Sequence, residues 1–173
     1  MHVNEIDVLR WFEGFHGSAL DPVMTGASAL ATSGIIWVAA GILLILMHRA
    51  RPGCSVIASV ILAYAVVDVV LKPVICRDRP FQVEDLDVLG ALPATWSFPS
   101  GHTASAFAGA VSLMIYDKRI GVPAFAFAVA VGVSRMYLCV HWPTDVLAGA
   151  VIGASAAVLV HMAIVGRPGS KDH

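Results

Sequence analysis

Long apolar runs separated by short polar stretches make up most of this chain. A helix rises about 1.5 Å per residue, so about 20 apolar residues cross the roughly 30 Å hydrocarbon core of a bilayer. The pattern predicts five transmembrane helices, at residues 22–47, 54–71, 103–116, 120–140 and 146–165. Asp68 and Arg135 are the only Asp, Glu, Lys or Arg side chains within these runs. The run at 103–116 is short for a span, and we expect that helix to begin in the headgroup region.

The first 21 residues have a different pattern, in which charged and aromatic residues are mixed at roughly helical spacing. Leu9, Arg10, Trp11, Phe12 and Phe15 illustrate it. Such a segment is typical of an amphipathic helix that lies on the membrane surface; the alternative is a solvated N-terminal tail. We therefore expect a single all-α domain over residues 1–173, a polytopic membrane helix bundle. Its parts are an interfacial segment at 1–21, the helical bundle at 22–165 and a cytoplasmic tail at 166–173.

Composition agrees with a lipid environment. Of the 173 residues, 58% are hydrophobic and 13% are charged, whereas a soluble domain has about 25% charged residues. The formal net charge of −1 argues against a nucleic-acid partner, which requires a strongly basic surface. The three cysteines lack metal-ligand spacing. Cys54 and Cys139 lie in apolar runs and are interpreted as core residues, and pairing of Cys76 with Cys139 is left open. Oligomeric state is also left open.

Basic residues near the ends of the apolar runs predict the orientation. Short cytoplasmic loops are enriched in Lys and Arg. If five helices alternate, the links at 48–53 and 117–119 and the tail at 166–173 share one side, and each of them contains Lys or Arg. That side is expected to be the cytoplasm. Three polar stretches, at 72–80, 99–102 and 134–145, then meet at the outer face of the cytoplasmic membrane, where charge is a functional-site hypothesis.

The first polar stretch contains two cations suited to a phosphate. Lys72 ends the second apolar run, and Arg79 follows it by seven residues. Pro73 and Pro80 favour a rigid turn over a continuous helix. A Lys point charge and an Arg fork suit a tetrahedral phosphate. The alternative is cations that snorkel at a helix end, and it is favoured for Lys72 taken alone and for Arg77.

The second polar stretch, Pro99-Ser100-Gly101-His102, opens the third predicted helix. Ser100 is a good N-cap residue, and Gly101 lets the backbone approach a ligand closely. The N–H groups of a first helical turn bind anions, so Ser100 and the Gly101 amide are candidate phosphate-binding groups. His102 is a candidate acid that donates a proton to a leaving oxygen. A helix-capping Ser-Gly is common, however, so this stretch is weak evidence by itself.

The third polar stretch is the most specific. Arg135 precedes His141 by six residues, and Asp145 follows His141 by four. Pro143 suits the first turn of a helix. A carboxylate that binds one imidazole nitrogen fixes the tautomer and makes the other nitrogen a better nucleophile or base. The alternative is a structural His–Asp pair between two helices.

Two acidic groups near these stretches have other interpretations. Glu84, Asp85 and Asp87 match no cation-binding loop motif, so a solvated loop over the site is favoured over a metal site. Asp68 precedes Lys72 by four residues and is expected to pair with it. The sequence therefore predicts no metal ligands and no cofactor.

Taken together, these residues resemble the type 2 phosphatidic acid phosphatase family. That family has the signatures Lys-x6-Arg-Pro, Pro-Ser-Gly-His and Ser-Arg-x5-His-x3-Asp, and this chain matches all three in order, at 72–80, 99–102 and 134–145. The resemblance implies that His141 attacks phosphorus, that Asp145 orients His141 and that His102 protonates the leaving group. It implies a phosphohistidine intermediate without a metal. Integral-membrane members commonly have six helices, and here an interfacial segment takes the place of the first.

The resemblance also implies the phosphate ligands, which are Lys72, Arg79, Ser100, Gly101 and Arg135. The short chain is similar to bacterial members that act on polyprenyl diphosphate, notably undecaprenyl diphosphate in cell-wall carrier recycling. The alternative substrates are phosphatidic acid and phosphatidylglycerol phosphate. The expected partners are thus a lipid phosphate and the bilayer.

Three further alternatives fit the sequence less well. Vanadium-dependent haloperoxidases share the signatures but are soluble, and the apolar runs argue against them. A transporter or channel would need polar residues deep in several helices, whereas the charges here gather at one end. A lipid-binding or scaffold protein would not need His102, His141 and Asp145 together.

Overall fold

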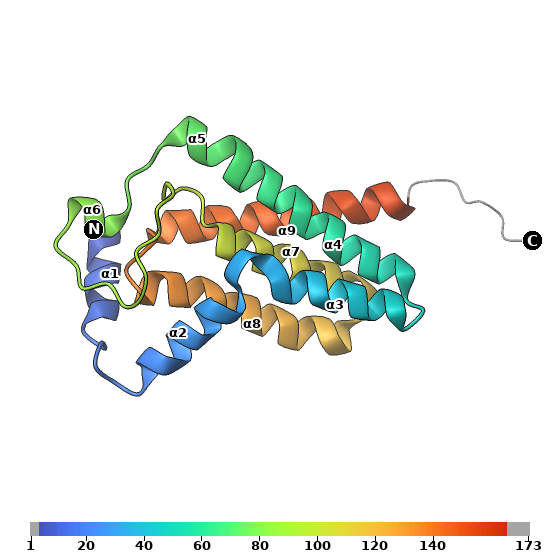
Figure 1. Ribbon diagram of the computed structural model, residues 1–173, viewed down its shortest axis with the longest axis horizontal. Helices are drawn as coiled ribbons and strands as arrows, with labels where there is room; N and C mark the ends of the chain where they lie inside the picture. The colour runs from blue at the N-terminus through green and yellow to red at the C-terminus, as the bar shows by residue number, and fades with distance from the viewer. Residues whose placement is uncertain (1–3, 166–173) are drawn as a thin grey trace, which may run out of the picture.

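The computed structural model describes residues 4–165, and every regular element in this range is a helix (Figure 1). The predicted tail at 166–173 lies outside the described residues. The prediction of an all-α membrane helix bundle is confirmed. Four helices form its body: α4 (Ala50–Tyr64), α7 (Gly101–Tyr116), α8 (Lys118–Tyr137) and α9 (Pro143–Val165).

Helix α7 lies at the centre of the bundle and packs against α4, α8 and α9. Small side chains let its neighbours approach closely, as is common where helices pack in lipid. A Cβ atom added to Gly153 of α9 would lie 2.2 Å from the carbonyl oxygen of Ala104, and one added to Gly109 of α7 would lie 2.4 Å from the ring of Trp37. The first contact brings α9 close to α7, so that Asp145 and His102 come from packed helices, and the second brings Trp37 of the first apolar run against α7.

The first apolar run does not form one straight helix. It consists of α2 (Leu20–Leu30), a 3₁₀ turn η1 (Thr32–Gly34) and α3 (Ile35–Leu46), with a 56° bend between the two α-helices. Gly34 has φ of 68°, a left-handed conformation that ends the helical path. The prediction of an unbroken span at 22–47 is therefore wrong.

The count of five spans is not confirmed. Among the described residues, three helical segments are long and apolar enough to cross a membrane, at 50–83, 118–137 and 143–165. The bent pair of α2 and α3 would make a fourth span. Helix α7 has 16 residues, in agreement with the expectation that the run at 103–116 is short. The chain is thus a multi-pass membrane protein whose central helix, α7, is shorter than the three segments at 50–83, 118–137 and 143–165.

The chain stays helical after α4 and leads directly into the first polar stretch. A π-helical segment η2 (Ala65–Leu71) leads into α5 (Lys72–Ile75), and α6 (Pro80–Val83) follows after a break. Pro73 therefore lies within a continuous helical path, contrary to the predicted rigid turn. A π-turn widens the hydrogen-bond ladder, and local adjustment of this kind accommodates proline. The path ends at Cys76, which has φ of 49°.

The two ends of the bundle differ. Helix α1 (Glu5–Glu13), α6 and the loop at 84–100 gather at one end, whereas the α3–α4 and α7–α8 turns and the end of α9 lie at the other (Figure 1). Helix α1 packs on α8 and α9 with Leu9 buried and Trp11 exposed. A helix is thus present in the predicted interfacial segment; its contact with a membrane stays a prediction.

All three cysteines are free among the described residues. Cys139 is buried, as expected, but Cys54 and Cys76 are exposed. The interpretation of Cys54 as a core residue is wrong, because this face of α4 points away from the bundle. Cys76 and Cys139 do not pair in this structure.

Candidate active site

The three polar stretches meet around a cavity of about 210 Å³. Six of the eight predicted site residues line it: Lys72, Arg79, Gly101, His102, Arg135 and His141. They come from α5, the segment before α6, the start of α7, the end of α8 and the α8–α9 turn. Ser100 and Asp145 are buried outside the lining. The sequence therefore identified residues that are far apart in the chain and converge in space.

His141 and Asp145 form the predicted pair. Nδ1 of His141 lies 3.4 Å from Oδ2 of Asp145, and the two side chains are 2% and 0% exposed. Pro143 begins α9, so the turn between them is set by the helix start. Burial lowers the pKa of His141 to about 3, so the ring is neutral. A proton on Nδ1 facing the carboxylate leaves the lone pair of Nε2 available.

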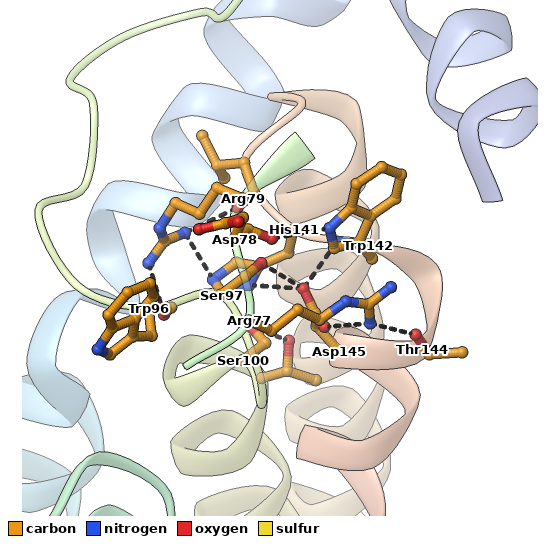
Figure 2. A network of polar contacts seen from close by, with 12 residues as sticks. Arg77, Asp78, Arg79, Trp96, Ser97, Ser100, His141, Trp142, Thr144 and Asp145 are labelled. Atoms are coloured by element: carbon orange, nitrogen blue, oxygen red, sulfur yellow. Dashed lines mark hydrogen bonds and ion pairs between the residues drawn. The ribbon is translucent and has the colours of Figure 1, made fainter. Parts of the chain in front are cut away.

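Asp145 is held by three further groups (Figure 2). Ser97 Oγ and the Trp142 backbone N–H donate hydrogen bonds to Oδ2, at 2.5 Å and 2.9 Å. Arg77 Nη1 donates to Oδ1 at 2.8 Å. Both carboxylate oxygens are therefore occupied, and the carboxylate has one orientation toward His141.

The sequence missed these supports of Asp145. Ser97 lies two residues before the second signature, and nothing in the sequence points from it to Asp145. Arg77 lies within the first polar stretch, but it was interpreted as a snorkelling cation. That interpretation is wrong, because Arg77 binds a buried carboxylate 68 residues away.

Arg79 is buried and fixed by backbone carbonyl groups. Its Nε donates to Thr95 O at 2.7 Å, and its Nη1 donates to Val140 O at 2.7 Å. Nη2 donates to Trp96 O at 3.2 Å. Neutral acceptors orient the guanidinium but do not cancel its charge, so Arg79 retains a full positive charge beside the cavity.

Arg135 has unused donor capacity at the cavity. Its Nη1 donates a hydrogen bond to Ser28 Oγ of α2. Its Nε is buried and has no hydrogen-bond partner within residues 4–165. An orphaned buried donor is costly unless a ligand satisfies it. Arg135 is thus prepared to bind an anion, and Ser28 is a support that the sequence did not reveal.

Lys72 and Asp68 form the expected pair. Lys72 Nζ lies 2.5 Å from Asp68 Oδ1, and both side chains line the cavity. Lys72 is almost fully buried. A carboxylate therefore lies inside a cavity whose other ionisable lining side chains include three cations and two imidazoles.

The second polar stretch begins α7 as predicted, but Ser100 does not cap it with its side chain. Ser100 Oγ accepts a hydrogen bond from Thr103 Oγ1 at 3.0 Å, and the Ser100 N–H donates to Asp145 O at 3.0 Å. A Cβ atom on Gly101 would lie 2.9 Å from Asp68 Oδ2, so glycine is needed there for Asp68 to approach. His102 lies in the first turn and lines the cavity.

The acidic loop packs against α1. Glu84 lies 3.5 Å from Arg10, and the Asp87 N–H donates to Glu13 Oε1 at 2.6 Å. Within the described part of the chain, no three His, Cys, Asp or Glu side chains gather as a metal site would require. The loop is thus tied to the N-terminal helix, a contact that the sequence pattern did not predict.

The sequence was compared with models of known protein families. The family model described as the PAP2 superfamily matches residues 52–167. The chain belongs to the PAP2 superfamily. All three signatures lie within the matched region, so the resemblance inferred from them is confirmed.

Individual proteins similar to this chain are named as phosphatases. It is 35% identical over 122 residues to the undecaprenyl-diphosphatase of Sulfolobus acidocaldarius, a match that covers 69% of this chain and 59% of that protein. It is 40% identical over 133 residues to the decaprenylphosphoryl-5-phosphoribose phosphatase of Mycolicibacterium smegmatis, covering 73% and 71%. The transmembrane PAP2-type phosphatidylglycerolphosphate phosphatase of Bacillus subtilis has a similar structure, with a TM-score of 0.78, 26% identity, and coverage of 98% of this chain and 90% of that one.

Proposed function

We propose that this PAP2 protein is a membrane lipid phosphatase that acts through a phosphohistidine intermediate. The observation that carries the proposal is the His141–Asp145 pair. His141 lines the same cavity as Lys72, Arg79 and Arg135. A neutral imidazole backed by a carboxylate is a nucleophile, and clustered cations stabilise the charge of a transferring phosphoryl group.

In the first step, Nε2 of His141 forms a bond to phosphorus while the bond from phosphorus to the leaving oxygen breaks. Burial, and then the charges of Arg135, Lys72 and Arg79, lower the pKa of His102 to about 3, so His102 becomes an acid only when the negative charge of the entering phosphate raises that pKa. The protonated His102 then gives its second ring proton to the leaving oxygen and becomes neutral, so the lipid product leaves with one negative charge fewer. In the second step, His102 takes a proton from a water molecule whose oxygen attacks phosphorus. The bond from phosphorus to Nε2 breaks, which releases inorganic phosphate and leaves His141 neutral.

Asp145 has a separate task in this scheme. It keeps the Nδ1 proton of His141 in place and stabilises the positive charge that the ring acquires in the phosphohistidine. The cations hold the nonbridging oxygens, and Nε of Arg135 has no protein partner among the described residues with which an oxygen would compete. Phosphoryl transfer depends mostly on such positioning and charge stabilisation. We infer that the reaction needs no divalent metal.

A polyprenyl diphosphate is the proposed substrate. Both relatives compared above are named for polyprenyl-linked substrates, and the undecaprenyl-diphosphatase is named for a diphosphate. The cavity lies at the end of the helix bundle, so a lipid tail would remain in the bilayer while its phosphate enters. The runner-up is a glycerophospholipid phosphatase, which the similarity to the phosphatidylglycerolphosphate phosphatase supports. A transporter or channel is less well supported, since the buried charges gather around one cavity at one end of the bundle.

We further propose that the cavity faces the outside of the cytoplasmic membrane. Its support is that both links at the opposite end of the bundle are short and basic, with Arg49 and Arg51 in one and Lys118 and Arg119 in the other. An extracytoplasmic site would act on lipids of the outer leaflet and release phosphate outside the cell.

The direct test is phosphate release from a panel of lipids by the purified protein in detergent. The panel contains a polyprenyl diphosphate, a polyprenyl monophosphate, phosphatidylglycerol phosphate and phosphatidic acid, with His141→Ala as the control. We expect the highest kcat/KM for the polyprenyl diphosphate and no release by the variant. A higher kcat/KM for either glycerophospholipid would favour the runner-up, and no release from any lipid phosphate would refute the enzyme class.

A further inference from the structure

We infer that Arg77, at a position that the first signature leaves unspecified, is a positioning residue that holds the catalytic Asp145 and is itself held in place by Glu5 of the N-terminal helix. The inference rests on the proposed function, because it concerns the same reaction. It assigns α1 a role in catalysis beyond any contact with the membrane.

Arg77 uses both terminal nitrogens of its guanidinium, each toward a different carboxylate. Nη1 donates to Asp145 Oδ1 at 2.8 Å and to Thr144 Oγ1 at 2.6 Å. Nη2 donates to Glu5 Oε2 at 2.6 Å. The guanidinium also lies over the ring of Trp142, 5.2 Å from its centre. An Arg fork can bridge two carboxylates in this way, and a Lys point charge cannot.

The contact with Asp145 matters because that carboxylate is completely buried. A buried negative charge is costly unless a cation or several hydrogen bonds compensate for it. Arg77 is the cation that contacts Asp145 directly among residues 4–165. It binds Oδ1, while Oδ2 faces His141, and Arg77 is not among the residues that line the cavity. Arg77 therefore sets the carboxylate's orientation without touching a substrate.

Glu5 fastens this arrangement from outside. Its Oε2 binds Arg77, and its Oε1 accepts hydrogen bonds from the backbone N–H and the hydroxyl of Thr144, at 2.8 Å and 2.7 Å. Partial burial acts to raise the pKa of Glu5, but the hydrogen bonds from Thr144 and then Arg77 outweigh it and lower that pKa overall. Glu5 is thus charged and joins α1 to the start of α9 next to Asp145.

Another ion pair of α1 provides a matched control. Arg10 lies 3.5 Å from Glu84, and both side chains are largely exposed. This pair also links α1 to the acidic loop that follows α6, but it does not touch Asp145. Exposed pairs of this kind contribute little to stability. Arg10→Gln should therefore leave kcat unchanged.

The test is a double-mutant cycle between Arg77 and Asp145, measured as kcat and KM for the lipid that the wild-type protein hydrolyses best. We expect Arg77→Gln to lower kcat about 10-fold with little change in KM, since coupled neighbours show strong interaction energies. In an Asp145→Asn background the same change should lower kcat less than about twofold, because the group through which Arg77 acts is already impaired. Arg77→Lys should recover part of the lost kcat by retaining the charge.

The cycle also separates this inference from a purely structural role. Glu5→Gln should also lower kcat, by a smaller factor than Arg77→Gln. This loss too should be seen in the wild-type background and not in the Asp145→Asn background. This variant carries the test if Arg77→Gln fails to fold, as judged by its gel-filtration profile and melting temperature. Equal losses of kcat in the wild-type and Asp145→Asn backgrounds would overturn the inference. A wild-type protein that hydrolyses no lipid phosphate would instead refute the proposed function.

Discussion

Nη1 of Arg79 lies 3.3 Å from Nε2 of His141, while Nδ1 of the same ring faces Asp145 at 3.4 Å. An arginine remains protonated, so it can only donate to Nε2, which must then carry a lone pair. The two ring nitrogens are therefore distinguished by their neighbours. In the proposed mechanism Nε2 is the nitrogen that attacks, and the cation beside it would hold an oxygen of the phosphoryl group.

His102 should be needed for the leaving group rather than for the attack. His102→Ala is expected to lower kcat strongly for a lipid phosphate monoester such as phosphatidic acid, whose alkoxide is a poor leaving group. It should lower phosphoenzyme formation much less for an aryl phosphate, whose phenolate needs no proton. Both rates can be compared by rapid quenching. Equal losses with the two substrates would contradict the assignment of His102 as the acid.

Asp68 should weaken anion binding, because its carboxylate occupies the cavity and neutralises Lys72 at 2.5 Å. Asp68→Asn is expected to lower the inhibition constant of inorganic vanadate several-fold, since a nearby carboxylate opposes an incoming anion. Asp117→Asn is the matched control, because Asp117 pairs with Arg49 at 3.6 Å at the opposite end of the bundle. Weaker vanadate inhibition in Asp68→Asn would show that Asp68 helps Lys72 to bind the anion instead.

Activity should not depend on a divalent metal, because Lys72, Arg79 and Arg135 supply the positive charge. Phosphate release is expected to be unchanged in excess chelator and unaffected by added magnesium. Vanadate should inhibit competitively, because it can adopt the five-coordinate geometry of an in-line attack. Arg135→Lys should weaken both catalysis and this inhibition, since a point charge cannot replace the guanidinium fork. Activity that is lost in chelator and restored by magnesium would contradict the metal-free mechanism.

The orientation can be checked with accessibility tags. A tag inserted between Arg49 and Arg51 should be reached from the cytoplasm, and a tag near residues 84–87 should be reached from outside the cell. The reason is the bias of basic loops toward the cytoplasm. A cytoplasmic tag at 84–87 would reverse the orientation and remove the proposed outer-leaflet substrate.

The signature residues could be predicted from sequence because their chemistry is local. His141 and Asp145 are four residues apart, so a turn and the start of a helix are enough to bring them together. Lys72 and Asp68 have the same spacing. Convergence of the three stretches followed from the alternation of apolar runs, which places every second link at the same end of the bundle.

The supports of these residues were not predicted, since they depend on distant parts of the chain. Ser28 reaches Arg135 only because the first apolar run bends at Gly34, a bend that hydrophobicity does not show. Arg77 reaches Asp145 only through the fold of the segment between α5 and α6. Polar contacts over such separations have no periodic signal in a single sequence.

The most direct test of the mechanism is to trap the enzyme during turnover and locate the phosphoryl group by mass spectrometry. A lipid phosphate is mixed with the wild-type protein and with His141→Ala, and each reaction is quenched in alkali, where phosphohistidine survives. The phosphohistidine mechanism predicts one phosphorylated residue, His141, in the wild-type protein and none in the variant. Phosphate release by the wild-type protein without a phosphorylated His141, or undiminished release by His141→Ala, would contradict it.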